Sequence, residues 1–234
     1  MTTPTKEKHE DSELHQEFQL ERMILFSDAV FAIVITLMAI EIQLPETHGL
    51  SLTTEEFSAG LKHVAPTLLA YAISFMFIGV IWHQHLKIFS LLKKFDSGLV
   101  VRNLILLFFV GLFPFAATVV ARGPKDGIIP IMIYLTIILL CMAALTLIEH
   151  HILVKKPELR NDHPIDKFMD EYGKRKFSVS MFTAVVILTY TTDYFITNPV
   201  FKFMPPLWSL IMPIGIKIRQ RALEKKKKVE QVKA

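Results

Sequence analysis

Long apolar runs separated by polar and charged connections dominate this chain. About 20 mainly apolar residues suffice to cross a bilayer as an α-helix. The pattern predicts six membrane-spanning helices, at approximately Arg22–Leu44, Leu61–Phe89, Leu99–Ala121, Ile128–His151, Phe177–Thr197 and Phe201–Ile218. Proline interrupts the last of these at three positions, whereas the single Pro114 in the third is tolerable because neighbouring helices can satisfy the backbone groups that it frees.

The composition agrees with an all-α integral membrane protein. Apolar residues make up 52% of the 234 residues, above the roughly 45–50% of soluble domains. The chain lacks the repeated alternating segments of about ten residues that are typical of outer-membrane barrels. Its one cysteine, Cys141, lies in an apolar run, so neither a disulfide framework nor a cysteine metal site is expected.

The basic residues give the expected orientation in the membrane. Six helices place 22 of the 26 Lys and Arg residues on the side that also holds both termini, and such an excess marks the cytoplasmic side. We expect a multi-pass protein of the cell inner (plasma) membrane without a cleavable signal peptide. Its parts are a cytoplasmic segment (1–20), a six-helix domain (21–218) and a basic cytoplasmic tail (219–234). The tail suits lipid headgroups, and we expect no nucleic-acid partner.

The first predicted helix carries polar residues at its start. Charged groups at membrane depth are costly, so Arg22 and Asp28 indicate a specific role. At about 100° per residue, Ser27 and Asp28 lie roughly 120° and 140° from Ile33. An apolar stripe surrounds Ile33 and comprises Phe26, Ala29, Val30, Thr36, Leu37 and Ile40. This stripe either packs against helices and lipid or narrows a pore, and the pattern leaves both interpretations open.

Further polar residues lie at the same expected depth on two other helices. Trp82-His83-Gln84-His85 ends the second helix and Asn103 begins the third, both toward the cytoplasm. Because polar groups at membrane depth need partners, we expect a network of Ser27, Asp28, Asn103 and one of His83 or His85. The two histidines diverge by about 200° on a helix, which argues against a shared metal.

These motifs carry a family resemblance. The heptapeptide Arg22-x-x-x-Phe26-Ser27-Asp28, together with Trp82-x-x-His85 and Asn103, resembles the transmembrane protein 175 family, which comprises lysosomal potassium channels of animals and their bacterial relatives. One heptapeptide and six helices are similar to the single-repeat bacterial form. The resemblance implies a homotetramer with a central pore lined by the first helix. It also implies a constriction at Ile33, followed by Thr36, Leu37 and Ile40, with Thr36 at a position implicated in potassium preference.

The same resemblance gives the heptapeptide a supporting role, in which it holds the first helix against the second and third. The expected function is a potassium-permeable channel with an apolar constriction, in which the potassium pathway passes near Ile33 and Thr36. The chain lacks a Thr-Val-Gly-Tyr-Gly filter, so the preference for potassium is expected to be modest. No cofactor is expected beside the permeant ion; the expected partners are the bilayer, potassium ions and other copies of the chain.

Two other function classes share parts of this pattern. In a proton-coupled cation transporter, Asp28 and the histidines would relay protons at membrane depth, although the sequence shows no inverted repeat. A membrane enzyme is not expected, because H-E-x-x-H and G-x-S-x-G motifs and paired intramembrane aspartates are absent from the sequence.

Overall fold

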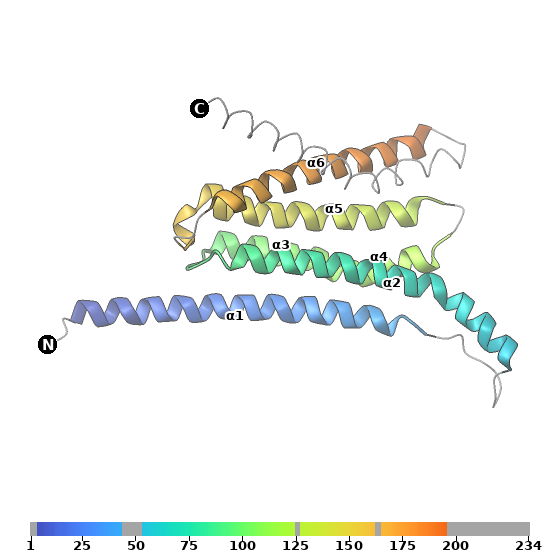
Figure 1. The fold of residues 1–234 in the computed structure, drawn as a ribbon, viewed down its shortest axis with the longest axis horizontal. Helices are drawn as coiled ribbons and strands as arrows, with labels where there is room; N and C mark the ends of the chain where they lie inside the picture. The colour runs from blue at the N-terminus through green and yellow to red at the C-terminus, as the bar shows by residue number, and fades with distance from the viewer. Residues whose placement is uncertain (1–3, 44–52, 125–126, 162–164, 196–234) are drawn as a thin grey trace, which may run out of the picture.

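The structure is a computed structural model that describes residues 4–43, 53–124, 127–161 and 165–195, with side chains from Leu14 onward. Long helices lie side by side and roughly along one direction (Figure 1). They are α1 (Pro4–Ile40), α2 (Thr54–Phe89), α3 (Ser97–Gly111), α4 (Phe113–Arg122), α5 (Ile129–His150) and α6 (Asp166–Phe195). A π-helical turn, η1 (His151–Lys155), and a 3-10 turn, η2 (Pro157–Leu159), connect α5 toward α6.

Four helical segments of the described chain are long and apolar enough to cross a membrane: Leu14–Ile40, Thr54–Phe89, Ser97–Arg122 and Ile129–Lys155. They confirm the first four predicted spans. The fifth predicted span coincides with α6, but the threonines, tyrosines and Asp193 in its second half make it too polar to join these four. It therefore stays a prediction. The sixth predicted span, 201–218, lies outside the described residues.

Three helices, α1, α2 and α6, begin well before their predicted spans; α6 begins at Asp166 instead of Phe177. α1 begins at Pro4, so the segment that we separated at residue 20 is continuous with the first span. α2 begins at Thr54 instead of Leu61 because Thr53 and Glu56 form a capping box. The Thr53 hydroxyl accepts from the Glu56 amide at 3.2 Å, and the Glu56 carboxylate accepts from the Thr53 amide at 2.9 Å. These bonds satisfy amides that the start of a helix leaves without partners.

The third span consists of two helices. α3 ends at Gly111 and α4 begins at Phe113, with Pro114 in the first turn of α4. Proline has no amide hydrogen and its ring clashes with the preceding turn, so it interrupts the hydrogen-bond ladder just before it. The span is thus correct in position, and Pro114 splits it where we expected a continuous helix.

α5 lies at the centre of the subunit, in contact with α2, α3, α4 and α6. α1 packs on α2, α3 and α4, and in Figure 1 it lies at the side of the bundle away from α6. In the most apolar stretch of α1 only 22% is buried, whereas 39% of the most apolar stretch of the span that begins with α5 is buried. The described subunit therefore leaves an apolar face of its first helix uncovered.

Candidate pore helix and its anchor

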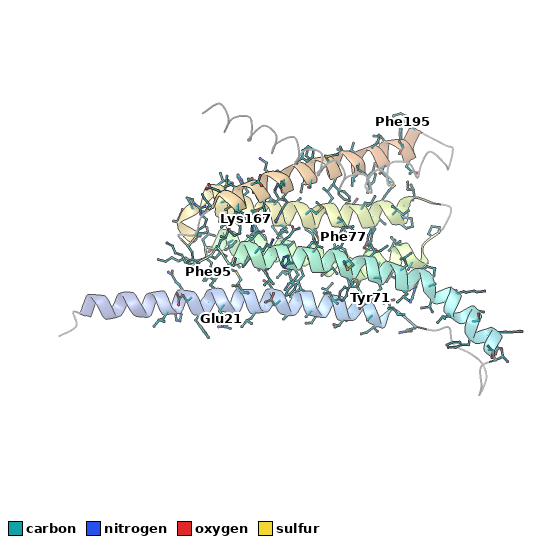
Figure 2. The ribbon with its side chains drawn as sticks, in the orientation of Figure 1. Glu21, Tyr71, Phe77, Phe95, Lys167 and Phe195 are labelled. Atoms are coloured by element: carbon teal, nitrogen blue, oxygen red, sulfur yellow. The ribbon has the colours of Figure 1, made fainter. Side chains whose placement is uncertain are left out.

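α1 has one face against the subunit and one face away from it. Ser27, Phe31, Val34 and Met38 recur every three or four residues and are buried against the neighbouring helices. Phe26, Ile33, Leu37 and Ile40 follow the opposite side and are exposed. Figure 2 shows side chains of α1 directed both toward α2 and away from the bundle. The helical wheel derived from the sequence therefore matches the burial, except that Val30 is half-buried and packs against the core.

A chain of buried hydrogen bonds fixes the inner face of α1. The Asn103 amide of α3 donates to the Ser27 hydroxyl at 2.8 Å, and that hydroxyl donates to the carbonyl of Met23 at 2.9 Å. The Asn103 side-chain oxygen accepts from Nε2 of His85 in α2 at 3.0 Å. Because Ser27, His85 and Asn103 are almost completely inaccessible, each needs its partner within the protein. Three helices are thereby joined at one level.

Asp28 lies beside this chain and has a different partner from those expected. Its carboxylate accepts from the Trp82 indole N–H at 2.9 Å. Trp82 precedes His85 by three residues, so both side chains lie on the same face of α2, where Trp82 meets Asp28 of α1 and His85 meets Asn103 of α3. This spacing is the physical reason for the Trp82-x-x-His85 motif: one residue bonds Asp28 and the other, through Asn103, is connected to Ser27.

Three of the predicted motif residues lie outside the hydrogen-bonded anchor. Arg22 is exposed, and its guanidinium lies 5.9 Å from the ring centroid of Phe18, one turn earlier in α1. Phe26 lies on the exposed face. His83 is exposed on another face of α2 from His85. In the described subunit the anchor is therefore formed by Ser27 and Asp28 from the heptapeptide, together with Trp82, His85 and Asn103.

The exposed stripe contains the four residues expected at the constriction. Ile33, Leu37 and Ile40 present apolar side chains, and Thr36 lies among them. The Thr36 hydroxyl donates within its own helix, toward the carbonyls of Ile33 at 2.9 Å and Ala32 at 3.1 Å. Because the hydrogen is used internally and the oxygen accepts none of these bonds, both of its lone pairs remain available as acceptors. The stripe is thus apolar with one hydroxyl oxygen among its side chains.

The opposite end of α1 has a second attachment, which the sequence analysis missed. Arg122, in the last turn of α4, donates to the Glu41 carbonyl at 3.1 Å and lies 3.3 Å from the Glu41 carboxylate. Both side chains are partly exposed, so the pair contributes little to stability and mainly sets position. Glu41 and Arg122 carry opposite charges near corresponding ends of the first and third predicted spans, and this pattern in the sequence could have predicted the pair.

A polar cluster that was also missed lies on the side of the Ser27 anchor. Asp96 caps α3 by accepting from the Leu99 amide at 2.7 Å, and His151 lies 2.9 Å from the same carboxylate. Burial raises the pKa of Asp96, but hydrogen bonds from His151 and Leu99 outweigh it, so this pKa lies below its ordinary value. Nearby, Arg175 pairs with the buried Glu149 at 3.4 Å. An aspartate just before an apolar run was the available signal for the cap.

The described residues contain no group of three or more His, Cys, Asp or Glu side chains placed to hold a metal ion. The site consists instead of an anchored helix face and an exposed apolar face with one hydroxyl.

Known proteins match this chain in the region that contains these residues. The family model described as endosomal/lysosomal potassium channel TMEM175 matches residues 22–114, which contain the anchor and the stripe. A potassium channel of Chryseobacterium sp. is 37% identical over 95 residues, covering 41% of this chain and 45% of the relative. The human endosomal/lysosomal proton channel TMEM175 is 33% identical over 135 residues, covering 55% of this chain and 27% of the relative. The chain thus spans about half or less of the length of these curated relatives.

The fold is similar to that of a solved structure. The lysosomal potassium-selective channel TMEM175 homolog from Chamaesiphon minutus superposes with a TM-score of 0.61 at 24% identity, covering 85% of this chain and 98% of that one. Four apolar helices and this fold define a multi-pass helical membrane protein with one internally anchored, outward-facing helix. Residues 22–114 of the chain are thus similar in sequence to the TMEM175 family.

Proposed function

We propose that this protein is a subunit of a potassium-permeable cation channel in which α1 lines the pore. The observation that carries the proposal is the two-sided structure of α1. One face is fixed by Ser27 and Asp28, while the other presents Ile33, Leu37 and Ile40 uncovered. Relatives of residues 22–114 that are named potassium channels support the permeant ion.

A homotetramer would place four copies of the stripe around one axis. Closed cyclic symmetry turns a single exposed stripe into a ring, which covers the apolar face that the subunit leaves open. The ring of Ile33 would form the narrowest apolar constriction, followed by Thr36, Leu37 and Ile40. Such a constriction controls conduction by dewetting and by partial loss of the ion's hydration shell, with the Thr36 oxygen as a ligand.

The proposed orientation follows the basic residues, with both termini cytoplasmic and the protein in the plasma membrane. The Ser27–Asn103 anchor then lies toward the cytoplasm and the Arg122–Glu41 pair toward the outside. Held at both ends, α1 would keep its constricting residues at a fixed distance from the axis.

The test is ion flux from liposomes that contain the purified protein, with potassium and sodium compared under equal gradients. Ile33→Asn should wet the constriction and raise flux several-fold. Ile187→Asn is the matched control, because Ile187 on α6 is 58% exposed and Ile33 is 55% exposed. Equal flux in wild type and Ile33→Asn would refute the proposed constriction.

A proton-coupled cation transporter is the alternative, and the human relative, named a proton channel, makes proton flux worth measuring in the same vesicles. A channel conducts potassium down its own gradient at equal pH on both sides. A coupled transporter requires a proton gradient or moves protons in fixed ratio with the cation.

A further inference from the structure

A groove of about 640 Å³ opens between α2 and α6, with α5 as its floor. Phe77 on α2 and the first turn of α6 at Lys167 are labelled in Figure 2 on the two helices that border it. No residue of α1 lines the groove. It is therefore separate from the proposed pore face and from the hydrogen-bonded anchor.

The lining changes from apolar to basic along α2. Met76 and Val80, toward the middle of the helix, are exposed apolar side chains. His83 and Gln84 follow, and Lys87 lies in the last turn of α2. A phospholipid has the same order along its length, with acyl chains in the bilayer interior and a charged phosphate at the surface. The groove thus has the polarity profile of one membrane leaflet.

The basic end contains three cationic side chains and one carboxylate. Lys87 and Lys174 are 47% and 35% exposed, and Arg175 lies beside them. Lys87 lies 4.0 Å from Glu171, the acidic residue of the lining, while Lys174 is 2.7 Å from Asp170 outside it. Arg175 lies 3.4 Å from Glu149, but its buried Nη1 has no hydrogen-bond partner among the described atoms. The cations therefore retain donors for an additional anion.

Gly79 keeps the apolar part of the groove open. A Cβ atom built on Gly79 would meet no atom within 4 Å, whereas one at Gly123 would approach Pro130 at 2.8 Å. The absence of a side chain at Gly79 leaves open space in the groove beside Met76 and Val80. An acyl chain placed there would cover apolar surface on α2 that the described subunit leaves exposed.

We propose that this groove binds an anionic phospholipid from the leaflet on the basic side of the membrane. Its phosphate would accept hydrogen bonds from Lys87, Lys174 and Arg175, and an acyl chain would lie along Met76, Gly79 and Val80. Basic pockets between membrane helices select anionic headgroups, because each nearby Lys or Arg adds attraction that a zwitterionic lipid does not gain. The bound lipid would join α2 to α6. This inference does not depend on ion conduction.

Lipid binding to the purified full-length protein in a non-ionic detergent, measured by native mass spectrometry, tests the proposal. Phosphatidylglycerol and phosphatidylcholine with identical acyl chains are the probes. We expect phosphatidylglycerol to bind at least tenfold more tightly. At about fivefold per lysine, the double variant Lys87→Gln/Lys174→Gln should lose roughly 30-fold in phosphatidylglycerol affinity. Lys167→Gln is the control, because Lys167 is an exposed residue of α6 outside the groove lining.

A second variant, Gly79→Leu, tests the acyl-chain position independently of charge, and it should weaken binding of both lipids several-fold. Equal affinities of the wild type for the two lipids would overturn the proposal. A loss in Lys167→Gln as large as that of the double variant would show general surface attraction instead of a site. Binding of neither lipid would overturn the proposal as well. Unchanged binding in Gly79→Leu would refute the placement of the acyl chain.

Discussion

Asn103 of α3 donates a hydrogen bond to the hydroxyl of Ser27 in α1 at 2.8 Å, and both side chains are almost completely buried. The two residues are 76 positions apart in the chain, so this bond determines how the first helix packs on the third. His85 completes the connection from α2. The residues beyond this anchor, on the other face of α1, are then left to face outward.

Replacing Asn103 with Ala should destabilise the protein by about 1–3 kcal/mol, because Ser27 and His85 both lose a buried partner. Ser27→Ala should have a smaller effect. Thermal unfolding in detergent measures both changes in stability. The double variant Ser27→Ala/Asn103→Ala then gives the coupling energy between the two side chains. We expect a coupling energy of roughly 0.6–2 kcal/mol, as found for polar contacts between membrane helices. Strict additivity of the two single effects would contradict a direct Ser27–Asn103 interaction.

The carboxylate of Asp28 is expected to act as a hydrogen-bond acceptor for Trp82 and not as an ion ligand. Asp28→Asn keeps an oxygen acceptor and should leave assembly nearly unchanged, whereas Asp28→Ala should weaken folding or assembly. Trp82→Phe keeps an aromatic ring, although a smaller one, and removes the N–H donor, at a cost of about 1 kcal/mol for the lost hydrogen bond. Size-exclusion chromatography and thermal unfolding report these effects. A stable Asp28→Ala oligomer with altered ion selectivity would place Asp28 in the ion pathway instead.

Removing the Thr36 hydroxyl while keeping the shape of the side chain should lower the preference for potassium over sodium without lowering stability. Thr36→Val achieves this, because within the described part of the chain the hydroxyl bonds only to carbonyls of its own helix, those of Ile33 and Ala32. Thr191→Val is the matched control, since the exposed Thr191 in α6 makes the same two kinds of bond. The measurement is the potassium-to-sodium flux ratio in liposomes. Equal ratios in both variants and wild type would remove Thr36 from the ion pathway.

Acid should weaken the Asp96 cap of α3. The pKa of Asp96 is lower in the folded protein than its ordinary value of 3.8, so its contribution is complete above that pH. The contribution is lost as the pH falls through the lowered pKa, because protonation removes the carboxylate that His151 and the Leu99 amide bind. Unfolding midpoints between pH 6 and the acid limit should therefore decline less steeply in Asp96→Asn than in wild type. Parallel declines would contradict this assignment.

The positions of the spans followed from the sequence because bilayer insertion depends on local hydropathy. The first four predicted spans match the four apolar helical segments that the structure describes. Helix ends were less predictable. The Thr53–Glu56 capping box starts α2 earlier than predicted, and Pro114 divides the third span into two helices. The first depends on two capping hydrogen bonds and the second on a proline that has no amide hydrogen, and mean hydropathy registers neither.

The sequence by itself determined that α1 has two faces, because helical geometry separates Ser27 and Asp28 from Ile33 whatever the surroundings. It also indicated which polar residues lie at a common depth. Only the tertiary structure decided that His85 and not His83 meets Asn103, that Trp82 bonds Asp28, and that Arg122 holds Glu41 at the far end. These pairings depend on the rotation and separation of packed helices, which arise from contacts between residues distant in the chain. Hydropathy and periodicity describe each helix alone, so they leave such contacts undetermined.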